Sequence, residues 1–157
     1  MKHTWMLGFC LVAFGGLAVS CGKRPDAASA DADPHLRTNG TVEVTAQLVE
    51  IPEGAIFKRD LYDYATILKY RVAKVHRGHV DGDTIYVGHY NPWKPRAEAA
   101  DKRAPGIGGS VRQFRAGQTH HLALEFPIED VFMGGIVNKY FGRTTNTLYW
   151  AVWTNGE

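Results

Sequence analysis

The sequence contains only two cysteines, Cys10 and Cys21, among its 157 residues. The first lies inside an apolar N-terminal segment and the second directly follows that segment, so the rest of the chain has no pair to cross-link. Small secreted domains that cannot build a sufficient core usually rely on disulfides. The part of the chain after Cys21 must therefore be stabilised by packing and by backbone hydrogen bonds.

A strong excess of charge of either sign is also missing. The chain has 18 basic and 16 acidic residues, which gives a formal net charge of +2. Residues 1–20 carry one charge, on Lys2, so the net charge without them is +1. Nucleic-acid-binding domains normally show a clustered basic excess. We therefore expect no nucleic-acid partner.

No apolar run reaches the roughly 20 residues that a membrane-spanning helix requires. The longest run covers residues 5–20 and is interrupted by three glycines. It follows a basic start at Lys2 and ends in small residues, which is the layout of a bacterial secretion signal. This layout predicts a signal peptide over residues 1–20, in preference to a permanent membrane-spanning anchor.

The end of the apolar run, Leu17-Ala18-Val19-Ser20-Cys21, resembles the cleavage box of bacterial lipoproteins. The resemblance implies that Cys21 takes a lipid, with acyl chains such as palmitate, and becomes the first residue of the mature chain. Ala18 stands where these boxes more often carry Leu, and an ordinary A-x-A-like cleavage site remains an alternative. Gly22 follows, which by resemblance to enteric lipoproteins favours the outer membrane, facing the periplasm or the cell surface.

Residues 21–40 are rich in Ala, Asp and Pro, and Leu36 is their only large apolar side chain. This composition is typical of a solvated, flexible tether. Alternating apolar residues begin at Thr41, so residues 41–157 are predicted to form a single folded domain. The domain order is thus signal peptide, lipid-anchored tether and folded domain.

Five segments of the folded domain show the alternation of half-buried strands, namely 41–51, 64–76, 84–90, 119–126 and 147–154. The buried face of the first four is expected to carry Val42, Val44, Ala46, Leu48, Leu68, Tyr70, Val72, Ile85, Val87, Leu122, Leu124 and Phe126. In the last segment, Leu148, Trp150 and Val152 alternate with Tyr149, Ala151 and Trp153. Breaks in the alternation predict β-bulges near Leu48-Val49 and Val72-Ala73.

A short helix is predicted over residues 96–103, which are mostly good helix formers after Pro95. Residues 127–146 are expected to be irregular, with one helical turn near 129–132. The order of three strands, a short helix and two strands is typical of an OB barrel. We therefore predict an all-β fold with one or two short helices, a small five-stranded OB-like closed barrel, with a β-sandwich as the alternative.

Two segments resemble the netrin-like (TIMP-like) OB barrels. Residues 68–87 contain the family pattern Y-x-V-x-K-V-x-x-G followed by G-D-x-I-x-V, and residues 114–124 are similar to its F-x-x-G-x-x-x-x-L-x-L strand entry. Metalloproteinase inhibitors of this group chelate zinc through a free N-terminal cysteine that disulfides hold in place. Because Cys21 is predicted to be acylated and has no disulfide partner, the resemblance implies the fold and not the inhibitory function.

Four histidines, His76, His79, His89 and His120, are weak candidates for a metal site. A zinc site needs three or four ligands that converge at about 2 Å from the ion. The sequence has no H-E-x-x-H pattern, and His120 and His121 should point to opposite faces of their strand. We therefore expect no metal or other cofactor and no catalytic residues, and we keep a metal-dependent envelope enzyme as the alternative.

The segment from His89 to Arg96 places Trp93 between two prolines and beside two cations. An aromatic side chain in a stiff basic loop suits stacking on sugar rings or contact with an acidic partner. The candidate ligand surface is therefore Tyr90, Trp93, Lys94 and Arg96, although Trp93 could instead fold back and close the barrel end. We expect a lipid-anchored, non-enzymatic binding or assembly module of the cell envelope for a protein or polysaccharide ligand. A structural spacer is the other alternative.

The lipoprotein interpretation predicts the mass of the mature protein. The wild-type chain should lose residues 1–20 and gain the mass of a lipid, whereas Cys21→Ala should gain none. Cys10→Ala, which changes the other cysteine, should mature like the wild type. Intact-mass spectrometry of the membrane fraction measures all three proteins, and an acyl-free, unprocessed wild-type chain would contradict the prediction.

Overall fold

The computed structural model describes residues 40–57 and 62–157, which belong to a unit spanning Arg37–Glu157. The predicted signal peptide, Cys21 and the predicted tether up to residue 39 lie outside the described residues. Among the described residues, no helix is both long and apolar enough to cross a membrane.

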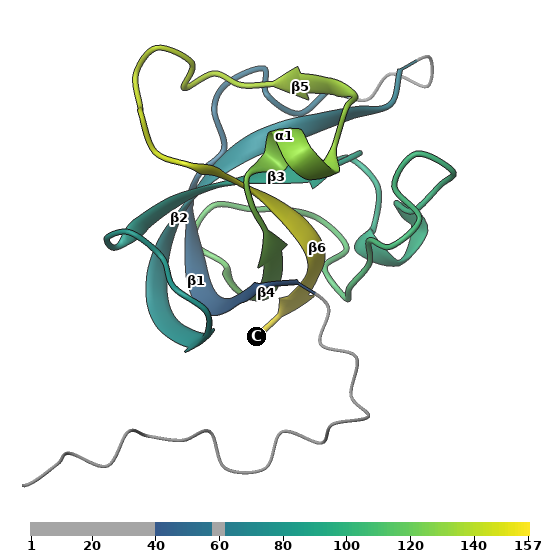
Figure 1. Cartoon of the computed structure of the whole chain (residues 1–157). Helices are drawn as coiled ribbons and strands as arrows, with labels where there is room; N and C mark the ends of the chain where they lie inside the picture. Colours follow the sequence, from purple (N-terminus) through teal and green to yellow (C-terminus); the bar gives the residue numbers. More distant parts are fainter. Residues whose placement is uncertain (1–39, 58–61) are drawn as a thin grey trace, which may run out of the picture. The chain divides into compact units, whose positions relative to one another are not determined.

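The sheet closes into a barrel (Figure 1). Its strands are β1 (Val42–Glu50), β2 (Tyr64–Arg77), β3 (Thr84–Tyr90), β4 (Thr119–Glu125) and β6 (Leu148–Gly156). They follow the order β1-β4-β6-β3-β2, and β2 pairs again with β1. Only the β3–β6 pair of this ring is parallel. This five-stranded mixed barrel confirms the OB-like prediction and excludes the open β-sandwich, which would leave strand edges unpaired.

The barrel interior holds the predicted apolar face of β1 to β4. The buried cluster contains the predicted residues Val42, Val44, Ala46, Leu48, Leu68, Tyr70, Ile85, Val87, Leu122 and Leu124, and Val72 is partly buried against it. Phe126 was expected in this face, but it is 46% exposed. The reason is that β4 ends at Glu125, so the alternation of the strand no longer applies at Phe126.

Both predicted β-bulges are present between β1 and β2. Leu48 pairs with Tyr70 and Glu50 with Lys69, which leaves Val49 without a partner. Thr45 pairs with Lys74 and Ala46 with Val72, which leaves Ala73 without a partner. Bulges bend and twist a strand, and this bending lets β1 reach β4 on one side and β2 on the other.

Alternation alone did not decide which face of strand β6 points into the barrel. Tyr149 and Ala151 belong to the interior cluster, whereas Trp150 belongs to a second buried cluster on the outside of the barrel. A register shift against β4 at Val152 then brings Thr154 into the interior, where it is fully buried.

Residues 127–146 cover Trp150. Helix α1 (Ile128–Val131) confirms the expected helical turn, while β5 (Gly135–Val137), which pairs in parallel with β2, was not predicted. Phe132 stacks on Trp150 with ring centroids 4.6 Å apart. On β3, a Cβ at Gly88 would lie 2.4 Å from Cδ1 of Ile128, so glycine permits this close packing.

The loop of residues 91–118 contains only one turn of 3₁₀ helix, η1 (Arg96–Glu98). The predicted helix over 96–103 is wrong beyond this turn. Asp101 explains the difference, since its Oδ1 accepts hydrogen bonds from the backbone N–H groups of Arg103 and Ala104. Aspartate side chains compete in this way with the helical hydrogen-bond pattern.

The second half of this loop lies along β6. The N–H of Gly108 donates to the carbonyl of Val152 at 2.9 Å, and the N–H of Thr154 donates back to Gly108 at 3.0 Å. The N–H of Ser110 then donates to the carbonyl of Thr154 at 3.1 Å. These hydrogen bonds to β6 fix the position of residues 108–110, from which the loop continues toward β4.

Gly109 lies at the closest approach of the loop to β6. Its φ is +132°, and a Cβ there would lie 2.0 Å from the carbonyl oxygen of Thr154. Gly117 is a matched control, because its φ is +91° and a Cβ would meet nothing within 4 Å. We expect Gly109→Ala to lower the free energy of unfolding by about 2–4 kcal/mol and Gly117→Ala by about 1–2 kcal/mol. Urea unfolding measures both values, and equal losses would show that the close approach is not required.

Candidate functional site

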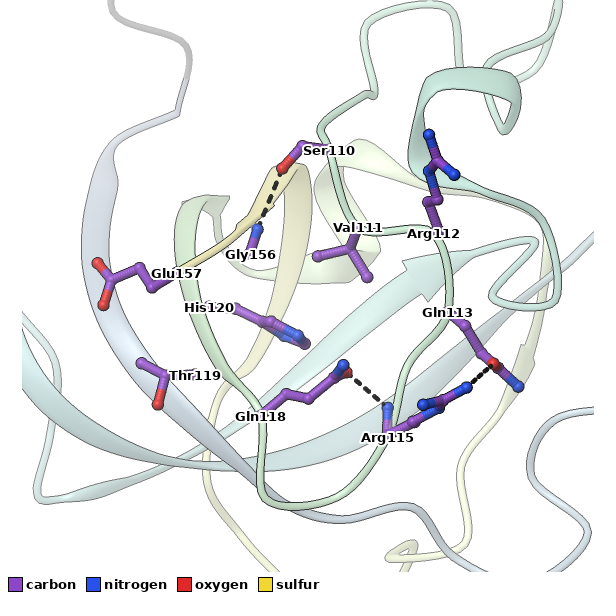
Figure 2. A pocket seen from close by; sticks show the side chains of 10 residues that line it. All are labelled: Ser110, Val111, Arg112, Gln113, Arg115, Gln118, Thr119, His120, Gly156 and Glu157. Carbon is purple, nitrogen blue, oxygen red and sulfur yellow. Dashed lines mark hydrogen bonds between the residues drawn. The ribbon is translucent and has the colours of Figure 1, made fainter.

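A cavity of about 410 Å³ opens at one end of the barrel. The loop before β4 and the ends of β4 and β6 supply its lining, which consists of Ser110, Val111, Arg112, Gln113, Arg115, Gln118, Thr119, His120, Gly156 and Glu157. In Figure 2, Val111, Gln118 and His120 point toward one another across the cavity. Its volume lies within the range of ordinary ligand pockets.

The walls of the cavity are held in place by hydrogen bonds and by one buried ring. Gly117 and Gln118 exchange backbone hydrogen bonds with Leu48 at 2.7 and 2.8 Å, which attaches the end of the loop to β1. Between its attachments, the loop is anchored by Phe114, whose ring lies 4.5 Å from that of His89 and 5.7 Å from that of His120. The cavity is therefore formed before any ligand arrives.

His120 connects the cavity to a polar network inside the barrel. Its Nδ1 lies 3.1 Å from the hydroxyl of Tyr70, which is also 3.1 Å from Nε2 of His89. Nδ1 of His89 lies 3.5 Å from the hydroxyl of Thr154. All four side chains are buried, His120 with 1% exposure. Sequence reasoning named both histidines but missed the tyrosine that joins them.

Burial keeps this network uncharged. It lowers the pKa of His120 to about 4. It also lowers the pKa of His89 well below its ordinary value, and the charge of Arg96 and the neighbouring His120 act in the same direction. Burial raises the pKa of the Tyr70 hydroxyl well above its ordinary value, which the charge of Arg96 partly opposes. At neutral pH the network therefore consists of neutral imidazoles and a neutral phenol.

The Tyr70 hydroxyl has one proton, so it donates to one imidazole and accepts an N–H from the other. If it donates to His89, then Nδ1 of His120 carries a proton and its Nε2 is a hydrogen-bond acceptor. If it donates to His120, then Nε2 of His120 carries the proton and is a donor. Nδ1 is the His120 nitrogen that bonds to Tyr70. His120 Nε2 can therefore either accept or donate toward the cavity without a change in net charge.

Arg96 has a structural role in this region. It is 3% exposed, and its guanidinium donates to the carbonyls of Tyr90, Asn91 and Lys94 at 2.7, 2.6 and 3.1 Å. The same group lies 5.2 Å from the centre of the Phe114 ring. Burial lowers the pKa of Arg96 to about 10, so it remains charged at neutral pH. Arg96 thus fixes the start of the loop and packs on the ring that anchors it.

The four residues of the predicted ligand surface do not form one exposed surface. Tyr90 is fully buried and donates its hydroxyl proton to Asp101 at 2.8 Å, and Arg96 points inward. Only Trp93 and Lys94 are partly accessible, with the Lys94 ammonium 4.8 Å from the indole centre. Nε1 of Trp93 is buried and has no hydrogen-bond partner among the described residues. Tyr90 and Arg96 make their contacts inside the fold, and ligand binding through the four predicted residues stays a prediction.

The four candidate histidines lie in three places. His89 and His120 are inside the barrel, His76 bonds to the Thr45 hydroxyl at 2.9 Å, and His79 lies 3.2 Å from Asp81 in the turn after β2. Within residues 40–57 and 62–157, no three His, Cys, Asp or Glu side chains are grouped so that they could hold a metal ion. Among the residues that line the cavity, His120 was named from the sequence only as a weak metal candidate, and most of the others stand in a loop whose sequence shows no periodicity.

Comparison with known proteins gives no relative. No protein-family model, curated protein or solved structure matches the chain. The lipoprotein and netrin-like resemblances therefore remain predictions, while the closed barrel is observed.

The buried histidines make the stability of the domain depend on pH. In the unfolded chain an imidazole takes up a proton below a pH of about 6.5, whereas His120 in the fold resists protonation down to about 4. The free energy of unfolding should therefore fall as the pH drops from about 6.5 toward 4, by at most about 1.4 kcal/mol per pH unit for each histidine. Above this pH range, the free energy of unfolding should no longer depend on the protonation of the two buried histidines.

His120→Gln should reduce this slope, because it removes one of the titrating groups from the fold. His79→Gln, which changes a ring with 86% side-chain exposure, should retain the wild-type slope. Urea unfolding at several pH values between 4.5 and 7.5, roughly the titration range of an imidazole, measures the three slopes. Equal slopes for the two variants would contradict the neutral, buried state of His120.

Proposed function

We propose that this protein is a non-enzymatic, lipid-anchored binding module of the bacterial cell envelope. In this proposal Cys21 carries the lipid, residues 22–40 are the tether, and the cavity at the barrel end holds part of an envelope protein or polysaccharide. One observation carries the proposal, namely the preformed cavity whose walls are fixed by the barrel, by Phe114 and by the Tyr70 network.

The chemistry of the lining favours binding over catalysis. A nucleophilic serine needs a base within hydrogen-bond reach, but Ser110 Oγ accepts its hydrogen bond from the N–H of Gly156 at 3.1 Å. The carboxylate of Glu157 accepts from the hydroxyl of Thr45 at 2.9 Å. His120 is held by Tyr70 and is an adaptable hydrogen-bonding group rather than the partner of an activated nucleophile.

The tether sets where such a ligand would be found. A flexible chain of roughly 20 residues has a mean end-to-end distance of about 25 Å, so the domain would work within a few tens of ångströms of its membrane. OB-like barrels commonly use their loops to bind oligonucleotides or oligosaccharides. The near-neutral net charge of this chain favours the second class.

Site-specific photo-crosslinking in the native envelope tests this proposal. A photoreactive amino acid in place of Thr119, at the cavity, should give a discrete adduct. The same amino acid in place of Asp81, in the turn between β2 and β3, should not give that adduct. The adduct should also depend on Cys21. Identical labelling from both positions, or none from position 119, would reject the cavity as the binding site.

A further inference from the structure

We infer that the cavity binds a small ligand through an anionic group that only accepts hydrogen bonds, such as a carboxylate or a phosphate. The inference rests on the proposed function, because it names the class of ligand for the same cavity. Its basis is the state of the polar atoms in the lining, where several side-chain acceptors already have partners while several side-chain donors of the described residues have protons left to donate.

The two glutamine side chains of the lining present donors. The Arg115 guanidinium donates to Oε1 of Gln113 at 2.9 Å, and the backbone N–H of Arg115 donates to Oε1 of Gln118 at 2.9 Å (Figure 2). An arginine and a backbone N–H can only donate, so in both amides the bonded atom must be the oxygen. Each –NH₂ group is therefore left to donate, and Figure 2 shows that of Gln118 pointing toward Val111 and His120 across the cavity.

The other polar groups of the lining follow the same pattern. Ser110 Oγ accepts from the N–H of Gly156 at 3.1 Å, so its hydroxyl proton is left to donate. The carbonyl of Thr119 accepts from the N–H of Glu157 at 3.2 Å, and Oε1 of Glu157 accepts from Thr45 at 2.9 Å. His120 Nε2 completes the set, because the Tyr70 network lets it take the donor state. A ligand that offers only acceptors matches this lining.

Charge selects an anion among such ligands. Among side chains, the lining carries two arginines, Arg112 and Arg115, and one carboxylate, Glu157, so positive charge is in excess by one. Arginine remains charged at any physiological pH. Hydrogen bonds from a cation to an anionic oxygen are shorter and about twice as strong as those between neutral groups. A neutral hydroxyl group would leave much of this donor capacity and both positive charges without a matching partner.

Isothermal titration calorimetry of the full-length protein in detergent tests the inference with three probes. Sodium D-glucuronate offers a carboxylate, inorganic phosphate offers a phosphate, and D-glucose is the neutral counterpart of glucuronate. We expect at least one anion to bind, more weakly at higher salt, and glucose not to bind. Binding of only one anion identifies the group that the cavity prefers.

Two variants locate the binding. Arg115→Gln should weaken anion affinity about tenfold or more, since it removes a charged donor from the lining. Arg143→Gln changes an exposed arginine outside the lining and should bind like the wild type. Circular dichroism of both variants checks that the barrel remains folded.

The inference is overturned if neither anion binds, if glucose binds as well as glucuronate, or if both variants lose affinity equally. Its failure can be told apart from failure of the proposed function. If the cavity position still gives its adduct in the envelope, the proposed function stands and only the anionic ligand class is rejected. If the adduct is absent while an anion binds, the cavity is an anion site and the proposed envelope ligand is rejected.

Discussion

The hydroxyl of Tyr70 is the contact on which the rest of the site depends. It joins β2 to His89 on β3 and to His120 on β4, and His89 in turn reaches Thr154 on β6. A buried polar group without a partner costs about 1–3 kcal/mol, so each of these side chains holds the next one in position. The ring of Phe114 packs on both histidines and carries the loop above them. The barrel core and the cavity are therefore parts of one packed unit.

Much of the fold could be predicted from the sequence, because period-two alternation and its interruptions report directly on strands and bulges. The breaks near Val49 and Ala73 are real bulges, and they help to close the barrel. The inward face of β6 was left open, because contacts distant in sequence decide it. Trp150 faces outward because Phe132 and the rest of residues 127–146 cover it there. The helix predicted over 96–103 stops early because a single side chain, Asp101, binds the backbone.

Less of the site could be predicted. His120 was noticed as a candidate metal ligand, but its partner Tyr70 stands 50 residues away, and no local pattern connects them. Arg96 was assigned to a ligand surface because it is one of the two cations beside Trp93 in a stiff, proline-bounded loop. Its actual partners are backbone carbonyls, which every residue has and no sequence motif marks. The donor-rich lining depends on which atom of Gln113 and Gln118 is already bonded, and only the folded structure determines that.

The most direct test of this account is nitrogen NMR of the histidine rings in protein labelled with ¹⁵N-histidine. At a pH of about 6, His89 and His120 should each show one protonated and one bare ring nitrogen, and the pattern should persist in His120 until the pH nears 4. Replacing Tyr70 with Phe should change the ring signals of both histidines together. A doubly protonated His120 ring at a pH of about 6, or His89 and His120 signals that do not respond to the Tyr70 change, would contradict the shared Tyr70 hydroxyl and the neutral state of His120 in the cavity lining.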